Sequence, residues 1–284
     1  MVDISVSASA GRLLVHRRLP RRGTLGFIML GFLVLASLLG PLAVPFDPER
    51  ASLLEIMQPP DFTHWFGTNS YGADIFARVL HAGRLDLLIA VVSVGGGLLV
   101  AMPIGALLGY SRGWWNTLVM RALDFVQSFP PFILAMALAA VAGASVLNVI
   151  LIIGFLNVPI FARLIRSEVL SYRERAFVEA ARCAGNSDLR LVIRHILPNA
   201  MSAAVAQASV NIGWALILTA GLSFVGAGVE PPTPEWGAMI SEGAEYIITG
   251  EWWIATFPGL ALCLTVLSFA LVGETLSSWL DVRR

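Results

Sequence analysis

Between Asp86 and Arg112 the chain reads LLIAVVSVGGGLLVAMPIGALLGYS, residues 87–111, without one charged side chain. About 20 apolar residues cross the hydrocarbon core of a bilayer, so this run is long enough to span a membrane. Gly105 and Gly109 within it form a small-xxx-small pair, which lets two membrane helices approach closely. The run therefore predicts a transmembrane helix that packs against another helix.

The composition of the whole chain is that of a membrane protein. Hydrophobic residues make up 57% and charged residues 13% of the chain, and the mean hydropathy is +0.76. A soluble domain carries about 25% charged residues. The charges gather in short patches with long uncharged runs between them, because a charge at the centre of a bilayer is costly.

Five apolar runs, one of them long enough for two helices, predict an all-α integral membrane protein with six transmembrane helices. The first run exceeds the apolar core of a secretory signal, about 7–15 residues, so we expect it to be retained. The run from 125 to 162 is too long for one helix, and residues 143–145 supply a turn that divides it. We expect helices near 25–45, 87–111, 118–141, 146–163, 200–224 and 252–273.

The arginines predict the orientation of these helices. All 19 basic residues are arginine, and cytoplasmic segments carry the excess of basic residues. With both termini cytoplasmic, only Arg50, Arg78 and Arg84 fall outside. The predicted organisation is a basic N-terminus at 1–24, a first helix at 25–45, an external loop at 46–84, a five-helix core at 85–280 with a cytoplasmic loop at 164–199, and a C-terminus at 281–284.

The cytoplasmic loop is the longest internal polar stretch between predicted spans, and it is expected to fold as helix, sharp turn, helix. The first helix is expected from Leu164 to about Ala184, followed by Gly185, which suits a left-handed helix end. Residues 186–188 offer a cap for a short second helix. Pro198 is expected in the first turn of the next membrane helix, where proline is tolerated.

Two interpretations of this loop remain open from the residues alone. In one, the loop is a docking knob: Ala180 and Ala181 allow close approach, and Glu179 accepts a hydrogen bond from a partner arginine. In the other, the loop is an amphipathic hairpin that lies on lipid headgroups, which the seven arginines between residues 163 and 194 also suit.

The spacing of this loop resembles that of a known family. Glu179-Ala180-Ala181, three residues, Gly185 and then Leu197-Pro198 resemble the EAA loop of permease subunits in binding-protein-dependent ABC importers. The stretches 175–182 and 194–199 are similar to the dipeptide, oligopeptide and nickel branch, and to the second, C-type permease of its pair. The other segments that resemble this branch are His64–Asn69 with Gly72, Asp74 and Arg78; Asp124 with Ser128, Phe129 and Pro130; Gly221–Gly226; and Pro231–Pro234 with Trp236 and Gly237.

The resemblance implies the type I importer permease fold and a division of labour. A second, homologous permease completes the pathway, two ABC ATPase subunits dock inside, and an extracytoplasmic binding protein delivers the substrate. The implied location is the bacterial inner membrane, and the implied transport is ATP-driven import of peptides by alternating access. The implied ATPase-coupling residues are Glu179, Ala180, Ala181, Gly185, Asn186, Ser187, Asp188, Leu189, Arg190, Leu197 and Pro198, with a coupling helix at 186–194.

No catalytic residue, cofactor or metal site is expected on this chain. It contains no lysine and so no G-x-x-x-x-G-K-[ST] loop, which places ATP and Mg on the partner subunits. Candidates for the pathway or its gate are Asp124, Ser128, Asn157 and Pro159. Asp124 is expected either to pair with Arg121, three residues before it, or to act in gating.

Other functions stay open at this point. An ion-driven secondary transporter is one alternative, although it would want ionisable groups in mid-membrane, and those are nearly absent. A structural membrane subunit of another complex is a second. For the substrate, a nickel chelate, glutathione or an opine-like compound stand beside peptides.

Overall fold

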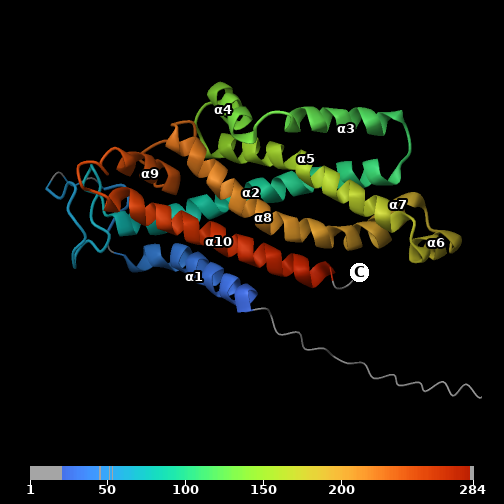
Figure 1. Cartoon of the computed structure of the whole chain (residues 1–284), viewed down its shortest axis with the longest axis horizontal. Helices are drawn as coiled ribbons and strands as arrows, with labels where there is room; N and C mark the ends of the chain where they lie inside the picture. The colour runs from blue at the N-terminus through green and yellow to red at the C-terminus, as the bar shows by residue number, and fades with distance from the viewer. Residues whose placement is uncertain (1–20, 45, 51, 53, 282–284) are drawn as a thin grey trace, which may run out of the picture.

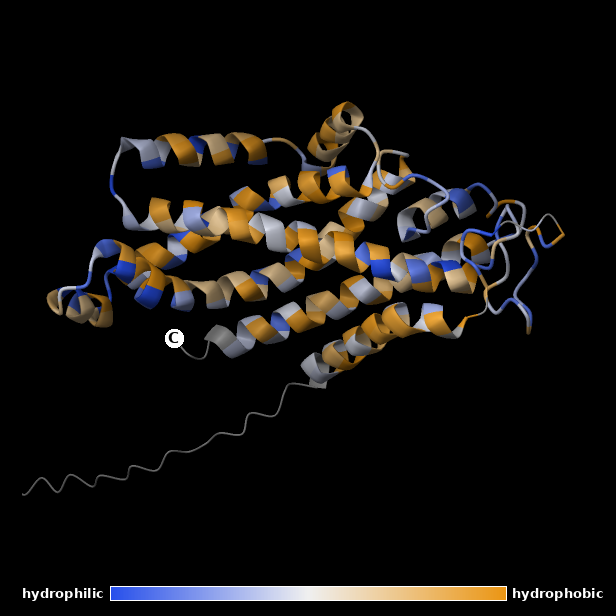
Figure 2. Ribbon diagram, turned by 180° about the vertical axis from the view of Figure 1, so that it is seen from behind, coloured by the Kyte–Doolittle hydropathy of each residue, from blue (hydrophilic) through white to orange (hydrophobic). Residues whose placement is uncertain are grey.

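Five helices in the described part of the chain are each long and apolar enough to cross a membrane. The computed structural model describes residues 21–44, 46–50, 52 and 54–281. The long helices run along the longest axis of the molecule, and apolar side chains cover much of their surface (Figures 1 and 2). They are α1 (Arg21–Ala43), α2 (Ile75–Tyr110), α5 (Val146–Arg173), α8 (Leu197–Phe224) and α10 (Trp253–Asp281).

The span expected near 118–141 is broken, so the prediction of one helix there was wrong. Helices α3 (Trp114–Gln127) and α4 (Pro131–Ala142) meet at 88° and together are apolar enough for a sixth span (Figure 1). Pro131 opens α4, and a proline forces the residue before it into an extended conformation. Pro130 accordingly has ψ of 124°, which ends the helical path between the two segments.

The turn predicted at residues 143–145 is present. Ser145 caps α5 by accepting a hydrogen bond from the Asn148 amide nitrogen at 3.1 Å. The Asn148 side chain donates back to the carbonyls of Ala142 and Gly143 at 2.8 and 3.0 Å. Polar side chains thus replace the backbone bonds that are missing where two helices meet.

The contact between α2 and α5 brings two backbones together. A Cβ atom added to Gly97 would lie 2.7 Å from the Gly154 carbonyl oxygen, and one added to Gly105 would lie 2.7 Å from that of Ala162. At Gly109 an added Cβ would lie 2.7 Å from the Val169 Cβ. The small-xxx-small pair is confirmed as a packing device, and Gly97 extends it by two turns.

Helix α5 ends earlier than the cytoplasmic helix expected from Leu164 to Ala184, and that prediction was wrong. The chain turns at Glu174 and resumes as α6 (Ala176–Cys183). The Arg173 guanidinium donates to the last carbonyls of α2, at Gly109 and Tyr110, over 3.3 and 3.1 Å. This cross-link fixes the end of α5, and the turn allows α6 to bury Val178, which is fully buried.

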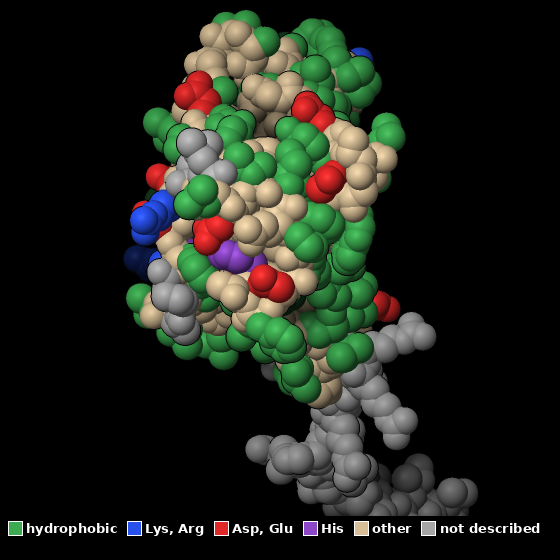
Figure 3. All heavy atoms as spheres, turned by 90° about the vertical axis from the view of Figure 1, so that its left-hand side faces the viewer, with side chains coloured by type: hydrophobic (Ala, Val, Ile, Leu, Met, Phe, Trp, Pro, Cys, Tyr) green, Lys and Arg blue, Asp and Glu red, His purple; other side chains and the backbone are tan. Residues whose placement is uncertain are grey.

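The end of the molecule away from α6 is a folded cap made of the 46–74 loop and α9 (Trp236–Ala244), a helix that the sequence did not predict. His64 Nδ1 lies 2.8 Å from Asp74 Oδ2, and Asp74 caps α2. The Trp253 indole donates to the Thr68 carbonyl at 3.2 Å. Acidic side chains are spread over this face, with few arginines (Figure 3).

Helices α1 and α10 lie side by side, and their ends that lead to the chain termini face away from the cap (Figure 1). Gly26 of α1 meets α10, where an added Cβ would lie 2.6 Å from the Leu271 Cβ. Helix α1 occupies Arg21–Ala43, a few residues before the predicted 25–45. Residues 1–20 and 282–284 of the two predicted terminal segments lie outside the described residues.

A substitution pair at neighbouring glycines tests the α2–α5 contact. Gly97→Ala should destabilise the protein by about 1–3 kcal/mol, because the new methyl group overpacks the contact with Gly154 and Asn157. Gly96→Ala is the control, since no atom lies within 4 Å of its added Cβ. It should instead stabilise the helix by about 0.5–1 kcal/mol. Unfolding in mixed micelles measures the free energy of unfolding of each variant. Equal changes for the two variants would contradict the contact.

Candidate functional site

A helical hairpin projects from the end of the molecule opposite the cap, beyond the ends of the long helices (Figure 1). It consists of α6, a turn and α7 (Asp188–Leu191), and we call residues 175–191 the α6–α7 hairpin. Glu179, Ala180, Leu189 and Arg190 on it are exposed. The hairpin therefore places a charged and an apolar surface where a partner can reach them.

Buried apolar side chains hold the hairpin on the helix bundle. Val178 of α6 and Leu191 of α7 are fully buried. The Phe177 ring packs edge-on against Tyr172 of α5 at 6.4 Å between centroids, and the Arg175 guanidinium lies 4.7 Å from the centroid of the same tyrosine ring. These anchors on both arms make the hairpin a fixed part of the molecule.

The turn of the hairpin is a Schellman motif, the helix end in which two bonds close around a left-handed residue. The Gly185 amide donates to the Arg182 carbonyl at 3.0 Å, and the Asn186 amide donates to the Ala181 carbonyl at 3.3 Å. Gly185 has φ of +82°, a conformation that glycine adopts without penalty. The predicted left-handed end at Gly185 is confirmed.

The Tyr110 hydroxyl ties the two arms to α2. It donates to the Asp188 carboxylate and accepts a hydrogen bond from the Arg182 guanidinium at 3.3 Å. This bond raises the pKa of Arg182, which keeps the guanidinium charged. Sequence reasoning missed Tyr110, although a tyrosine that ends an apolar run is a signal for a polar contact at the membrane surface.

Asn186 and Ser187 lie just before the second helix, as predicted, but neither side chain caps that helix. The Asn186 side chain donates to the Ala181 carbonyl at 2.8 Å, which reinforces the turn. Ser187 precedes α7 in an extended conformation, yet its hydroxyl makes no capping bond to that helix. The second arm is consequently held by Leu191 and by the bond between Asp188 and Tyr110 rather than by a serine cap.

Helix α7 continues into α8 without a loop. A π-helical turn, η1 (Val192–Ile196), joins them, and its bonds skip one residue more than those of an α-helix. Pro198 has no amide hydrogen, so the Arg194 carbonyl has no α-helical donor, and the wider turn accommodates this gap. The predicted coupling helix at 186–194 is thus the inner extension of a membrane helix.

Glu179 lies on the open side of α6. No described residue donates a hydrogen bond to its carboxylate, and Ala180 beside it is also exposed. A polar hollow next to it is lined by Arg112, Arg173 and Arg182, together with Glu174 and Asp188. The carboxylate is therefore free to accept bonds from a partner that docks on this surface.

The structure separates the four pathway candidates into two groups. Asp124 pairs with Arg163 of α5 at 2.6 Å rather than with Arg121, so the expected local pair was wrong. Ser128 ends α3, where its hydroxyl donates to the Phe125 carbonyl at 2.7 Å. Both side chains are exposed on the side where α3 crosses α5.

Asn157 and Pro159 lie inside the helix bundle and not on an open surface. Asn157 is fully buried, donates to the Ile153 carbonyl at 2.9 Å and accepts from Asn211 of α8 at 2.8 Å. The side-chain oxygen of Asn211 accepts a hydrogen bond in turn from the side-chain nitrogen of Gln207 at 2.8 Å. Asn157 therefore joins α5 to α8, and α5 remains helical through Pro159.

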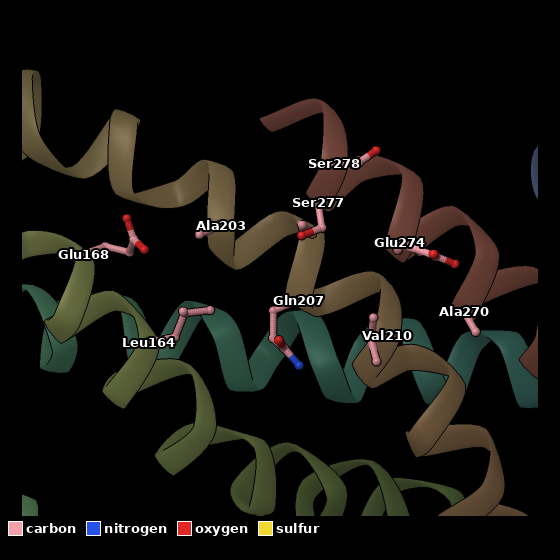
Figure 4. Close-up of a pocket in the computed structure, with 11 residues that line it drawn as sticks. Leu164, Glu168, Ala203, Gln207, Val210, Ala270, Glu274, Ser277 and Ser278 are labelled. Carbon is pink, nitrogen blue, oxygen red and sulfur yellow. The ribbon is translucent and has the colours of Figure 1, made fainter. Parts of the chain in front are cut away.

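The Gln207 end of this amide chain opens into a groove on the inner half of the molecule. Gln207 lies between two carboxylates, Glu168 of α5 and Glu274 of α10 (Figure 4). Sequence reasoning missed all three, although Glu274 is the first charged residue after the last apolar run. The groove is also lined by Leu164, Ala203, Ala206, Val210, Ala270, Gly273, Ser277 and Ser278.

Comparison with known proteins shows which family and which relatives the chain is similar to. Residues 101–284 match the family described as binding-protein-dependent transport system inner membrane component. The dipeptide transport system permease protein DppC of Alkalihalophilus pseudofirmus is 36% identical over 256 residues, which cover 90% of this chain and 84% of that protein. The glutathione transport system permease protein GsiD of Escherichia coli O6:K15:H31 is 40% identical over 251 residues, 88% of this chain and 82% of that protein.

A solved structure shares the fold. A chain of the MetNI methionine ABC transporter in an inward facing conformation superposes with a TM-score of 0.57 at 18% identity. The match covers 72% of this chain and 96% of that chain. The predicted type I importer permease fold is confirmed.

A substitution at Gly185 tests the turn. Gly185→Val should destabilise the hairpin by about 1–2 kcal/mol, because a β-branched residue resists positive φ. No atom lies within 4 Å of the added Cβ, so the effect isolates the backbone. Gly185→Asn is the control, since asparagine tolerates this conformation. Hydrogen exchange of the α6 and α7 amides should quicken about tenfold in the valine variant only, and unchanged exchange would contradict the assignment.

Proposed function

This chain belongs to the inner membrane components of binding-protein-dependent transport systems, and we propose that its α6–α7 hairpin couples an ATPase to one half of a translocation pathway. The chain is a permease of an ABC importer and a multi-pass protein of the inner membrane. The family assignment sets aside the ion-driven transporter and the structural subunit. What the hairpin does within that transporter is the proposal.

The observation that carries the proposal is that an anchored, exposed hairpin is continuous with a membrane helix. Val178 and Leu191 fix its arms, and η1 joins α7 to α8 without a loop. A partner that grips the hairpin therefore moves α8 with it. We assign this grip to two ABC ATPase subunits, which bind ATP and Mg, because this chain has no loop to hold the phosphates.

Glu179 is the proposed anchor of that contact. Its carboxylate is exposed, receives no hydrogen bond from a described residue, and stands beside the small Ala180. A groove on the ATPase with an arginine at its edge would accept both features. Closure of the ATPases on ATP would tilt α8 and switch the pathway between outward and inward access.

A second, homologous permease is the proposed partner within the membrane. Helix α3 has no buried residue in this chain, and Leu118 and Phe125 on it are 60% and 66% exposed. It packs on α5, with the Asp124–Arg163 ion pair between the two helices, and Asn116 near its start donates to the Leu108 carbonyl of α2. A partner permease would cover this helix and enclose the pathway between the two subunits.

The outer cap is the proposed docking face for an extracytoplasmic binding protein. Exposed acids on it include Asp47, Glu49, Asp61, Glu230 and Glu245. A backbone hydrogen bond from His64 lowers the pKa of Asp61, which keeps this part of the face anionic. A basic surface on the binding protein would complement it and speed their association.

The proposed substrates are short peptides or glutathione. The relatives named above are permeases for dipeptides and for glutathione, and both ligands are small peptides. Nickel chelates and opine-like compounds remain the alternatives. Ligand identification on the cognate binding protein distinguishes them, because that protein captures the substrate first.

The proposed orientation puts both termini and the hairpin in the cytoplasm. The arginine asymmetry supports it, and the ends of α1 and α10 that lead to the chain termini both face away from the cap (Figure 1). Cysteines introduced in a Cys183→Ser, Cys263→Ser background test it. Ser187→Cys should resist an impermeant thiol reagent in intact cells, and Glu230→Cys should react. The opposite pattern would refute the orientation.

Replacement of Glu179 tests ATPase docking. Truncation of one partner of a desolvated charge pair costs about 2–5 kcal/mol. Glu179→Ala should therefore lower both the ATPase recovered with the permease and ATP-dependent uptake in proteoliposomes. Glu179→Gln should be milder, because the amide keeps one acceptor. Capture of substrate by the binding protein should not change.

Glu174→Ala is the matched control for this experiment. Glu174 is an exposed carboxylate five positions earlier, and it forms an ion pair with the neighbouring Arg173 at 3.3 Å. It lies before α6 and so outside the proposed contact. Equal losses for Glu174→Ala and Glu179→Ala would indicate a general charge effect, and wild-type behaviour of Glu179→Ala would leave the lipid-surface interpretation standing.

A further inference from the structure

Two carboxyl groups are buried side by side at the outer end of the bundle. Asp86 of α2 is 2% exposed, and Glu235, which precedes α9, is 1% exposed. The Trp236 amide donates to Asp86 at 3.1 Å, while those of Gly237 and Ala238 donate to Glu235 at 2.9 and 2.7 Å. Since three consecutive amides of one helical turn serve both groups, the carboxyls are neighbours.

No basic side chain of the described residues neutralises this pair. On α2, Arg78 donates to the carbonyls of Pro48 and Pro232, and the His81 ring contacts a carbonyl of its own helix. Arg84 donates to carbonyls of α1. On α9, Glu242 accepts bonds from the 69–70 loop and so adds no positive charge. Two carboxylates buried without a cation repel each other strongly.

The hydrogen bonds around the two groups are unequal. Glu235 accepts from two backbone amides and lies in hydrogen-bond contact with the Ser223 hydroxyl of α8. Asp86 accepts only from Trp236, and no described donor reaches its buried Oδ1. A proton on Asp86 would supply the hydrogen-bond donor that the pair of carboxyl groups lacks.

We propose that Asp86 and Glu235 form a proton-binding site, in which one proton resides on Asp86 Oδ1 and is donated to the Glu235 carboxylate. The resulting bond ties α9 to α2. Because Ser223 ends α8 and also accepts from the Val229 amide at 3.2 Å, the same site fastens α8 to the cap. This inference does not depend on the function proposed for the hairpin.

The proton makes the outer cap sensitive to pH. Burial raises the pKa of Glu235, against the opposing effect of its amide donors. The folded protein thus holds a proton that the unfolded chain releases above about pH 4. The stabilisation is complete below that value and is lost as pH rises, when two like charges are left in contact beneath α9.

Infrared spectroscopy of the full-length chain in nanodiscs tests the site directly. Wild type at neutral pH should show the carbonyl absorption of a buried, protonated carboxylic acid, and Asp86→Asn should lose it. Glu242→Gln is the matched control, a nearby carboxyl with ordinary donors, and should keep the absorption. Absence of the absorption in wild type, or its persistence in Asp86→Asn, would overturn the proposal.

Thermal unfolding supplies a second measurement. The side-chain amide that Asp86→Asn introduces can donate to Glu235 without titrating, so the melting temperature of this variant minus that of wild type should grow from pH 5 to pH 8. Glu235→Gln should melt below Asp86→Asn, because its amide nitrogen cannot accept from Gly237 or Ala238. A difference that is flat with pH, or wild-type stability that instead follows sodium or potassium concentration, would refute the proton site.

Discussion

Contact between the backbones of α2 and α5 is the constraint on which the rest of the structure depends. Gly97, Gly105 and Gly109 leave no room for a side chain, and the carbonyls of Gly154 and Ala162 fill the space. The approach also sets Asn157 beside Gly97, from where it reaches Asn211 of α8. Within the bilayer the hydrophobic effect contributes little to the association of apolar helices. Close packing and interhelical hydrogen bonds hold them together instead.

The two ends of this bundle are built in different ways. At the outer end, α9 and the 46–74 loop are bound by buried polar groups, including His64 with Asp74 and Trp253 with Thr68. At the inner end, the α6–α7 hairpin has only two fully buried anchors, Val178 and Leu191, and its outer surface is open. The cap is therefore held by buried polar contacts, whereas much of the hairpin surface is exposed.

Much of the fold was predictable because the bilayer restricts what a spanning segment can be. Length and hydropathy located the long helices, and the glycines at 105, 109 and 185 were correctly interpreted from local geometry alone. The break between α3 and α4 has a local cause, Pro130 and Pro131, whereas two other failures arise from a partner that lies far away in the sequence. Arg163 of α5 pairs with Asp124 of α3. Arg173 at the end of α5 donates to the carbonyls of residues 109 and 110 of α2.

Within the hairpin, the sequence located the turn and the exposed residues but not Tyr110, which binds both arms from α2. The amide chain from Gln207 to Asn157 escaped prediction for the same reason, since each member is an ordinary polar residue until helices are packed. Helix α9 is short, and nothing in its nine residues distinguishes it from a loop without the Glu235 cap.

The uninterrupted path from α7 through η1 to α8 has a mechanical consequence. Its 37 residues form one rod of about 55 Å, longer than the membrane core is thick. A rotation of about 5° around one end would carry the other end through about 5 Å, roughly one helical turn. Because α7 is one end of this rod, a tilt of α8 moves the second arm of the hairpin with it.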